Sequence, residues 1–292
     1  MQDLVNRQSA YQHGHAAPRD DIDQNVYEAI RLYLREDLGH SEEVARTRAE
    51  EELQRKVAIA AVDSVAAAGI AVTGAEVLDL GSGLGALSEE LVLRGARVTA
   101  LEPGAAWADV TRRRVERHGR PFRLVQAFGE DIPLPNETVD LVMSLQVLEH
   151  VNAPQRVLAE AWRVLRPGGS FYLACENYLA FREGHYQLPW LPLLPKPLGA
   201  AYLRLCGRSP KFLYEAVTYT TYPGVLRMCR RLGFIRQRDE AIWVGLREKS
   251  GMKWTLLRAI ATIAGTESVL RLDRARDTFK FGIYELFRKP KA

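Results

Sequence analysis

Short apolar runs alternate with helical segments between Ala75 and Ala174, and this alternation restricts the fold more than any other feature. The predicted strands are Val77–Leu80, Val98–Leu101, Arg123–Val125, Asp140–Ser144 and Ser170–Ala174. The predicted helices between them are Leu84–Arg94, Ala105–His118 and Pro154–Val164. Repeated strand–helix–strand units indicate a doubly wound α/β fold with a parallel sheet. In such sheets the ligand lies at the carboxyl ends of the strands.

The part of the chain before the alternation is predicted to be helical. Apolar side chains recur at helical spacing over Gln24–Leu38, and a second helix is expected from the N-cap Ser41 to about Ala68. Residues 1–22 are polar and are expected to form a loose arm. We therefore predict a helical N-terminal cap over residues 1–72.

The part after the fifth predicted strand has a different character. Residues 176–222 are rich in proline and aromatic side chains and have no clear period, so we expect an inserted segment within a core of residues 73–292. Leu188–Leu205 is apolar, but its four prolines and two charges exclude a membrane-spanning helix. A helix is predicted at Pro223–Leu232 and an amphipathic stretch at Trp254–Ala264. The apolar run Phe279–Phe287 is expected to return as the last strand.

Charge and cysteine content exclude some functions. The 292 residues carry 40 Lys and Arg against 36 Asp and Glu, and a net charge of +4 does not favour nucleic-acid binding. Arg112, Arg113, Arg114 and Arg117 are interpreted as a solvated helix face. The N-terminus lacks a signal-peptide pattern. Three unpaired cysteines are expected to be buried small hydrophobes in a reducing cytoplasm: Cys175, Cys206 and Cys229.

A glycine-rich turn follows the first predicted strand. Its glycines, Gly81, Gly83 and Gly85, allow a sharp turn and a close approach to a ligand, and they fit a dinucleotide site as well as other nucleotide sites. Asp79 would repel a pyrophosphate but suits a ligand with a cationic amine. Glu102 ends the next strand, 21 residues after Gly81, where an acid can accept ribose hydroxyls. Asp79, together with the sequence blocks that follow, disfavours a nicotinamide oxidoreductase.

Three further blocks complete the pattern, namely Phe128–Pro135, Gln146–Val151 and Arg163–Gly169. Together with the glycine turn they make Glu76–Ala174 resemble the class I S-adenosylmethionine (SAM)-dependent methyltransferases, in the branch related to ubiquinone and menaquinone methyltransferases. The resemblance implies a Rossmann-like, mostly parallel seven-stranded sheet with a helical N-terminal cap and an inserted lid. It also implies SAM as the cofactor and S-adenosylhomocysteine (SAH) as the product.

The resemblance assigns most of the cofactor contacts. Asp79 would orient the ammonium group of SAM, Glu102 would take the ribose hydroxyls, and the loop after the third strand would hold the adenine. Phe128 stands where the family often has Asp, so the adenine amino group would contact Glu130, Asp131 or backbone groups, or Phe128 would stack on the ring. The implied cofactor residues are Asp79, Gly81, Ser82, Gly83, Glu102, Pro103, Phe128, Gly129, Glu130, Leu145 and Gln146.

A metal site is not predicted from this pattern. Related quinone O-methyltransferases carry Glu-x-x-Glu-His and a later His, and they use these residues for a divalent cation. Here Gln146 occupies the first position, Glu149-His150 follows, and Pro154 stands where the later His would fall. His150 is therefore expected to orient the following segment or to contact substrate.

The inserted segment offers the groups that an acceptor site needs. A hydroxyl acceptor must lose its proton, which requires a base. His185 is the predicted base, with Glu183 as its orienting partner or as the base itself; equally, both could only pin the insertion by hydrogen bonds. Segments like this one also occur in bacterial methyltransferases of glycan and secondary-metabolite pathways. The predicted acceptor-binding residues are Asn177, Tyr178, Tyr186, Trp190 and His150.

The sequence thus predicts a cytoplasmic SAM-dependent methyltransferase. Its acceptor is expected to be a small molecule or a glycan-type hydroxyl, methylated at oxygen by in-line displacement. One alternative is a lipid or quinone methyltransferase at a membrane surface. Another is a non-catalytic binding protein with the same fold. A homodimer is possible, and no nucleic-acid partner is expected.

Overall fold

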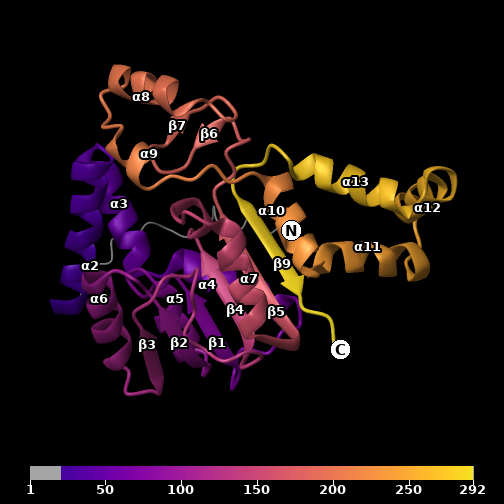
Figure 1. Ribbon diagram of the computed structural model, residues 1–292, viewed down its shortest axis with the longest axis horizontal. Coiled ribbons are helices and arrows are strands. Elements are labelled where there is room, and N and C mark those ends of the chain that lie inside the picture. Colours follow the sequence, from indigo (N-terminus) through magenta and orange to yellow (C-terminus); the bar gives the residue numbers. More distant parts are fainter. Residues whose placement is uncertain (1–20, 292) are drawn as a thin grey trace.

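The computed structural model describes residues 21–291, and its centre is one seven-stranded sheet (Figure 1). The strand order is β3-β2-β1-β4-β5-β9-β8; the first five strands are parallel, and β9 runs antiparallel to both of its neighbours, β5 and β8. The strands are β1 (Glu76–Leu80), β2 (Arg97–Leu101), β3 (Phe122–Val125), β4 (Val139–Leu145), β5 (Leu165–Cys175), β8 (Ile235–Arg236) and β9 (Ile283–Arg288). The prediction of a mostly parallel, seven-stranded, doubly wound sheet is confirmed.

Helices cover both faces of this sheet. On one face α4 (Lys56–Ala67) and α5 (Ala86–Leu93) bury alanine, valine and leucine side chains against β1, β2 and β4, and Val115 of α6 (Ala105–Glu116) joins them. On the other face α7 (Pro154–Val164) and α10 (Tyr222–Leu232) pack against β1, β4, β5 and β9. Burial of both faces explains why the strands are continuous apolar runs.

The N-terminal helices are α2 (Asp21–Leu32), a wide turn η1 (Tyr33–Asp37) and α3 (Glu42–Leu53). Ser41 caps α3 as predicted, because its hydroxyl accepts from the Val44 N–H. The predicted single helix from Ser41 to Ala68 is wrong. It is divided at Arg55, whose φ of 53° is left-handed, and whose side chain pairs with Glu89 and Glu90 of α5.

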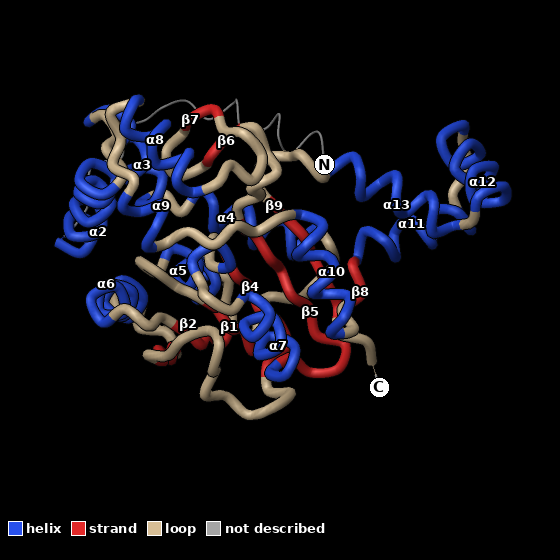
Figure 2. Tube along the Cα trace, turned by 45° about the horizontal axis from the view of Figure 1, so that its top comes forward, coloured by secondary structure: helices blue, strands red, loops and turns tan. Residues whose placement is uncertain are grey.

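The inserted segment is more regular than its sequence indicates. It contains the short hairpin β6 (Arg182–Glu183) and β7 (Leu188–Pro189), followed by α8 (Lys196–Leu205) and α9 (Lys211–Glu215). Figure 2 shows this segment lying over the sheet beside α3. One shared core joins it to the N-terminal helices, and its buried members are Leu34, Leu38, Ala45, Tyr178, Tyr186, Trp190, Leu203, Phe212, Leu213 and Val217.

A helical arm leaves the edge of the sheet after β8. It consists of α11 (Gln237–Glu248), α12 (Met252–Ala264) and α13 (Thr266–Asp277), and the chain then returns as β9 (Figure 1). Only α12 was predicted, because α11 and α13 are rich in charged residues and show a weaker apolar pattern. No helix in the described part of the chain is both long and apolar enough to cross a membrane.

Two expectations about single side chains are corrected by tertiary packing. Arg114 does not belong to a solvated face: it is 1% exposed and its Nε lies 2.7 Å from Glu89, which Arg117 also contacts at 2.6 Å. Burial acts to raise the pKa of Glu89, but these cations hold it at about 2. Cys206 is exposed at the end of α8, whereas Cys175 and Cys229 are buried as expected.

Candidate functional site

The glycine turn lies where β1 ends and α5 begins. Gly81, Gly83 and Gly85 have φ values of 78°, 53° and 84°, which are left-handed and favour glycine. A Cβ at Gly81 would lie 2.4 Å from a methyl group of Val147, in the turn after β4. The close approach places the glycine turn directly against the turn after β4.

Two acids lie beside this turn. Asp79 is 1% exposed, and Ser88 donates a hydrogen bond of 2.6 Å to its carboxylate. Burial, aided by the charge of Glu102, raises the pKa of Asp79 to about 7. Glu102 accepts the N–H groups of Gly83 and Gly104, both at 2.9 Å, and so ties the two loops together. A cationic ligand group beside Asp79 would stabilise its ionised form.

The other predicted cofactor residues border the same edge. Phe128 is 69% exposed, and Gly129 lies close enough to Val157 that a Cβ there would be 3.4 Å from a methyl group. Gln146 has a left-handed φ of 55°, and its N–H donates to the carbonyl of Ala174. Ser82 is buried, Glu130 and Leu145 are partly buried, and Pro103 is exposed. Their contacts with SAM stay predictions.

Trp107 is a site candidate that the sequence did not single out. Its ring lies 3.6 Å from where a Gly83 Cβ would be and 3.7 Å from the equivalent point at Gly104. The indole is 42% exposed, and it meets Tyr33 of the N-terminal helices edge-on at 6.3 Å. The sequence could have indicated Trp107, because it is an aromatic residue in the first turn of the helix that follows the second predicted strand.

The predicted base and its partner are in contact. Nδ1 of His185 lies 2.9 Å from Oε1 of Glu183, which is buried and also accepts the Tyr186 N–H. Burial acts to lower the pKa of His185, but the hydrogen bond and charge of Glu183 raise it overall. The backbone of this hairpin is held by the N-terminal helices, because His40 contacts the His185 carbonyl at 2.6 Å. The hairpin loop at His185 is therefore held by Glu183 through the side chain and by His40 through the backbone.

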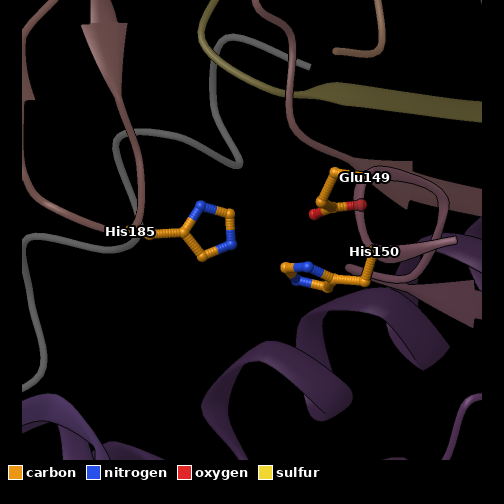
Figure 3. Close-up of side chains that lie close together, drawn as sticks. All are labelled: Glu149, His150 and His185. Carbon is orange, nitrogen blue, oxygen red and sulfur yellow. The ribbon is translucent and has the colours of Figure 1, made fainter. Parts of the chain in front are cut away.

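His185 also meets the turn after β4. Figure 3 shows Glu149 and His150 pointing toward His185, and one ligand atom from each residue lies within 4.8 Å of the others. The two imidazole rings are edge-to-face, 5.1 Å apart. His185 belongs to the hairpin 35 residues beyond His150, so the sequence spacing alone did not predict this cluster.

Some polar atoms of this cluster have hydrogen-bond partners and others do not. Glu149 is fully buried, burial raises its pKa to about 7, and its Oε2 has no hydrogen-bond partner among the described residues. Nδ1 of His150 contacts the Ala216 carbonyl at 2.7 Å. The surrounding protein, which excludes water from the ring, and the nearby charge of His185 lower the pKa of His150 to about 4. Nδ1 of His150 and Nδ1 of His185 thus each have a hydrogen-bond partner. Nε2 of neither ring has one among the residues that the structure describes.

This donor set fits a divalent cation. Two imidazoles and a carboxylate are ligands of zinc and other transition metals, and a carboxylate behind a ligating histidine is a recurring arrangement. Glu183 stands in that position behind His185. The buried, unpartnered oxygen of Glu149 is the observation that tests the fit. His185 supplies the imidazole that the sequence lacks at Pro154.

The predicted acceptor-binding residues are mostly enclosed. Asn177 donates to the carbonyls of Thr278 and Lys280 and accepts two N–H groups, so it anchors the start of the insertion. Tyr178 donates to Glu183 at 3.3 Å. Tyr186 and Trp190 are buried in the shared core of cap and insertion. Whether any of them touches an acceptor stays a prediction.

Comparison with known proteins identifies the family. A family profile described as "Methyltransferase domain" matches residues 78–173. The ubiquinone biosynthesis O-methyltransferase of Pseudomonas putida (strain W619) is 32% identical over 161 residues, which cover 49% of this chain and 68% of that protein. The chain belongs to the class I SAM-dependent methyltransferases. The predicted family and its cofactor, SAM, are thereby confirmed.

Further relatives of this methyltransferase define how far the likeness extends. The ubiquinone biosynthesis O-methyltransferase of Methylobacterium sp. (strain 4-46) is 35% identical over 125 residues, which cover 41% of this chain and 50% of that protein. The methyltransferase thus spans about half the length of the first curated relatives that it matches. A solved structure from Galdieria sulphuraria, provisionally named a sarcosine dimethylglycine methyltransferase, has a TM-score of 0.53 and 15% identity, and covers 93% of this chain and 99% of its own. That likeness concerns the fold alone.

Proposed function

We propose that this methyltransferase transfers the methyl group of SAM to a hydroxyl oxygen of a small-molecule acceptor by in-line displacement. The contact of 2.9 Å between His185 and the buried Glu183 carries the proposal. A hydroxyl acceptor must lose its proton, and a histidine with a carboxylate partner is suited to take it near neutral pH. The relatives named as O-methyltransferases support transfer to oxygen.

The position of the hairpin supports the same assignment. The glycine turn touches Val147, which is two residues before Glu149, so the methionine end of SAM and the cluster share one edge of the sheet. In the proposed mechanism Glu183 holds Nδ1 of His185, and Nε2 takes the acceptor proton. Holding the acceptor in line with the methyl group contributes up to about 7–11 kcal/mol in the best model reactions, and a positioned base about 10²–10⁴-fold.

The test compares His185→Ala with Gln187→Ala, a control in the same hairpin. Binding of SAH is measured by calorimetry, and turnover is measured with a panel of phenols, catechols and sugar-type alcohols. We expect His185→Ala to leave SAH affinity within about twofold and to reduce kcat about 100-fold or more. Turnover close to that of the wild type would remove His185 from the mechanism and leave Glu183 and His185 as residues that pin the insertion.

A second candidate mechanism is favoured by the unpartnered Oε2 of Glu149. In it Glu149, His150 and His185 hold a divalent cation, while Glu183 orients His185. Such a cation supplies Lewis-acid stabilisation of the acceptor oxygen. The two mechanisms use Nε2 of His185 differently, and metal binding distinguishes them.

Calorimetry with Zn²⁺ and Mn²⁺ supplies that distinction without any turnover. Metal binding that weakens at least tenfold in His150→Ala, but not in the control His118→Asn in the turn after α6, supports the cation. Full turnover after dialysis against EDTA, together with no saturable metal binding, supports the metal-free base.

Other acceptors and states remain competing proposals. A glycan-type hydroxyl would use the same chemistry. Leu191 and Leu193, which are 63% and 46% exposed between prolines, favour an alternative lipid or quinone acceptor at a membrane surface; liposome flotation tests it. A non-catalytic protein would bind SAH weakly and turn over no acceptor. The cytoplasmic location, the absence of a nucleic-acid partner, the possible homodimer and the boundary of the cap at residue 72 are likewise proposals.

A further inference from the structure

A pocket lies away from the cluster of Glu149, His150 and His185, between α10, α13 and the strands β8 and β9. Its volume is about 280 Å³. Figure 1 shows α10, α13 and β9, and Figure 2 shows β8 next to α10. Its lining includes neither the glycine turn nor the histidine cluster. The apolar side chains that line it are Pro223, Leu226, Phe234, Ala275 and Phe287.

Arginine side chains dominate the polar part of this pocket, which we call the arginine pocket. Those that line it are Arg227, Arg230, Arg236, Arg271 and Arg274. Asp239 is the one acid in the lining that the structure describes, and both Arg236 and Arg274 contact it. Arg236 is buried and also pairs with Glu285 at 2.7 Å. These two arginines are therefore neutralised by acids of the protein.

The other three arginines leave a positive rim. Arg227 and Arg230 are exposed, and they form no ion pair with any residue that the structure describes. They are three residues apart on α10, so they lie on one face of the helix. Among the described residues Arg271 of α13 has a long ion pair of 3.8 Å with Glu267, and its side chain is 77% exposed. The unpaired Arg227 and Arg230 and the weakly paired Arg271 thus line the same pocket as the apolar side chains.

We propose that the arginine pocket binds a small organic anion with an apolar body, either a carboxylate or a phosphate monoester. Guanidinium groups recognise both head groups through paired hydrogen bonds. The apolar floor accommodates a short hydrocarbon or ring, as is usual in ligand sites of about 300–1,000 Å³. The volume, just below that range, limits the ligand to a compact one. This site is separate from the proposed methyl transfer.

Calorimetry on the full chain tests the arginine pocket with octanoate, octyl phosphate and the neutral comparator octanol. We expect saturable binding of at least one anion, with octanol at least tenfold weaker. The double variant Arg227→Ala/Arg230→Ala should weaken anion binding at least tenfold. Arg231→Ala, an exposed arginine of the same helix outside the lining, should change it less than twofold. The preferred anion identifies the head group.

A second variant distinguishes the pocket from general surface charge. Ala275→Phe fills the pocket without removing a charge, and it should abolish binding while the circular dichroism spectrum and the melting temperature are retained. The proposal is overturned if octanol binds as tightly as the anions, if Arg231→Ala weakens binding as much as the double variant, if Ala275→Phe has no effect, or if neither anion binds.

Discussion

We expect the buried carboxylate of Asp79 to make the affinity for the cofactor depend on pH. Burial raises its pKa to about 7 in the ligand-free protein, and in the contact that we propose only its ionised form would attract the ammonium group of SAH. Lower pH therefore requires a proton to be released before the ligand binds, and the affinity falls. The sign follows because a raised carboxyl pKa favours the neutral form until the pH exceeds that pKa.

The magnitude can be worked out from that pKa. A group with a pKa of about 7 is about one tenth ionised at pH 6 and about three quarters ionised at pH 7.5. If SAH binds only the ionised form, its association constant rises about eightfold over this interval. Calorimetry in two buffers with different ionisation enthalpies should also show nearly one proton released on binding at pH 6.

Variants of Asp79 and its neighbour test the reasoning. Asp79→Asn removes the titrating group, so affinity should be weaker and nearly independent of pH. Ser88→Ala removes the hydrogen bond that stabilises the ionised carboxylate, so the midpoint of the pH dependence should move upward. An affinity that is flat between pH 6 and 7.5 in the wild type, or a slope that survives in Asp79→Asn, would refute this account.

Two further predictions concern stability and are checked by denaturant unfolding. Gly81→Ala should destabilise by more than Gly69→Ala: both glycines have φ near 80°, which costs alanine about 1–2 kcal/mol, but only Gly81 would place a Cβ 2.4 Å from Val147. Equal losses would contradict the steric reading. Arg114→Met should cost about 3 kcal/mol, since it leaves a buried carboxylate short of a partner, whereas the exposed Arg112→Met should cost less than about 0.5 kcal/mol. Similar costs for both arginines would show that the buried pair contributes little.

Acid stability offers a related check on the same ion pairs. The pKa of Glu89 is held at about 2, below its ordinary value, so its contribution to stability is complete above the ordinary value and is lost as the pH falls toward 2. The wild type should therefore lose more stability between pH 5 and pH 2 than Glu89→Gln does. Parallel acid unfolding curves for the two proteins would contradict this assignment.

The local apolar pattern of the sequence was enough to predict the strands that carry the proposed cofactor residues. The strands around Asp79 and Glu102 are buried on both faces, so each appears in the sequence as a continuous apolar run. Because parallel strands end at one edge, the order of the motifs also placed their acids together. The insertion was harder, since α8 and α9 bury only part of their surface and prolines obscure their period.

Tertiary structure alone decided which distant side chains meet. The sequence determined the parallel sheet, the glycine turn and the acids beside it, because those features depend on periodicity and on residues close in the chain. It could not bring His185 to Glu149 and His150, bury Arg114, or gather arginines of α10 and α13 around one pocket. Those contacts depend on how the cap, the insertion and the arm pack on the sheet. Packing of that kind is set by the whole chain together and leaves no local pattern.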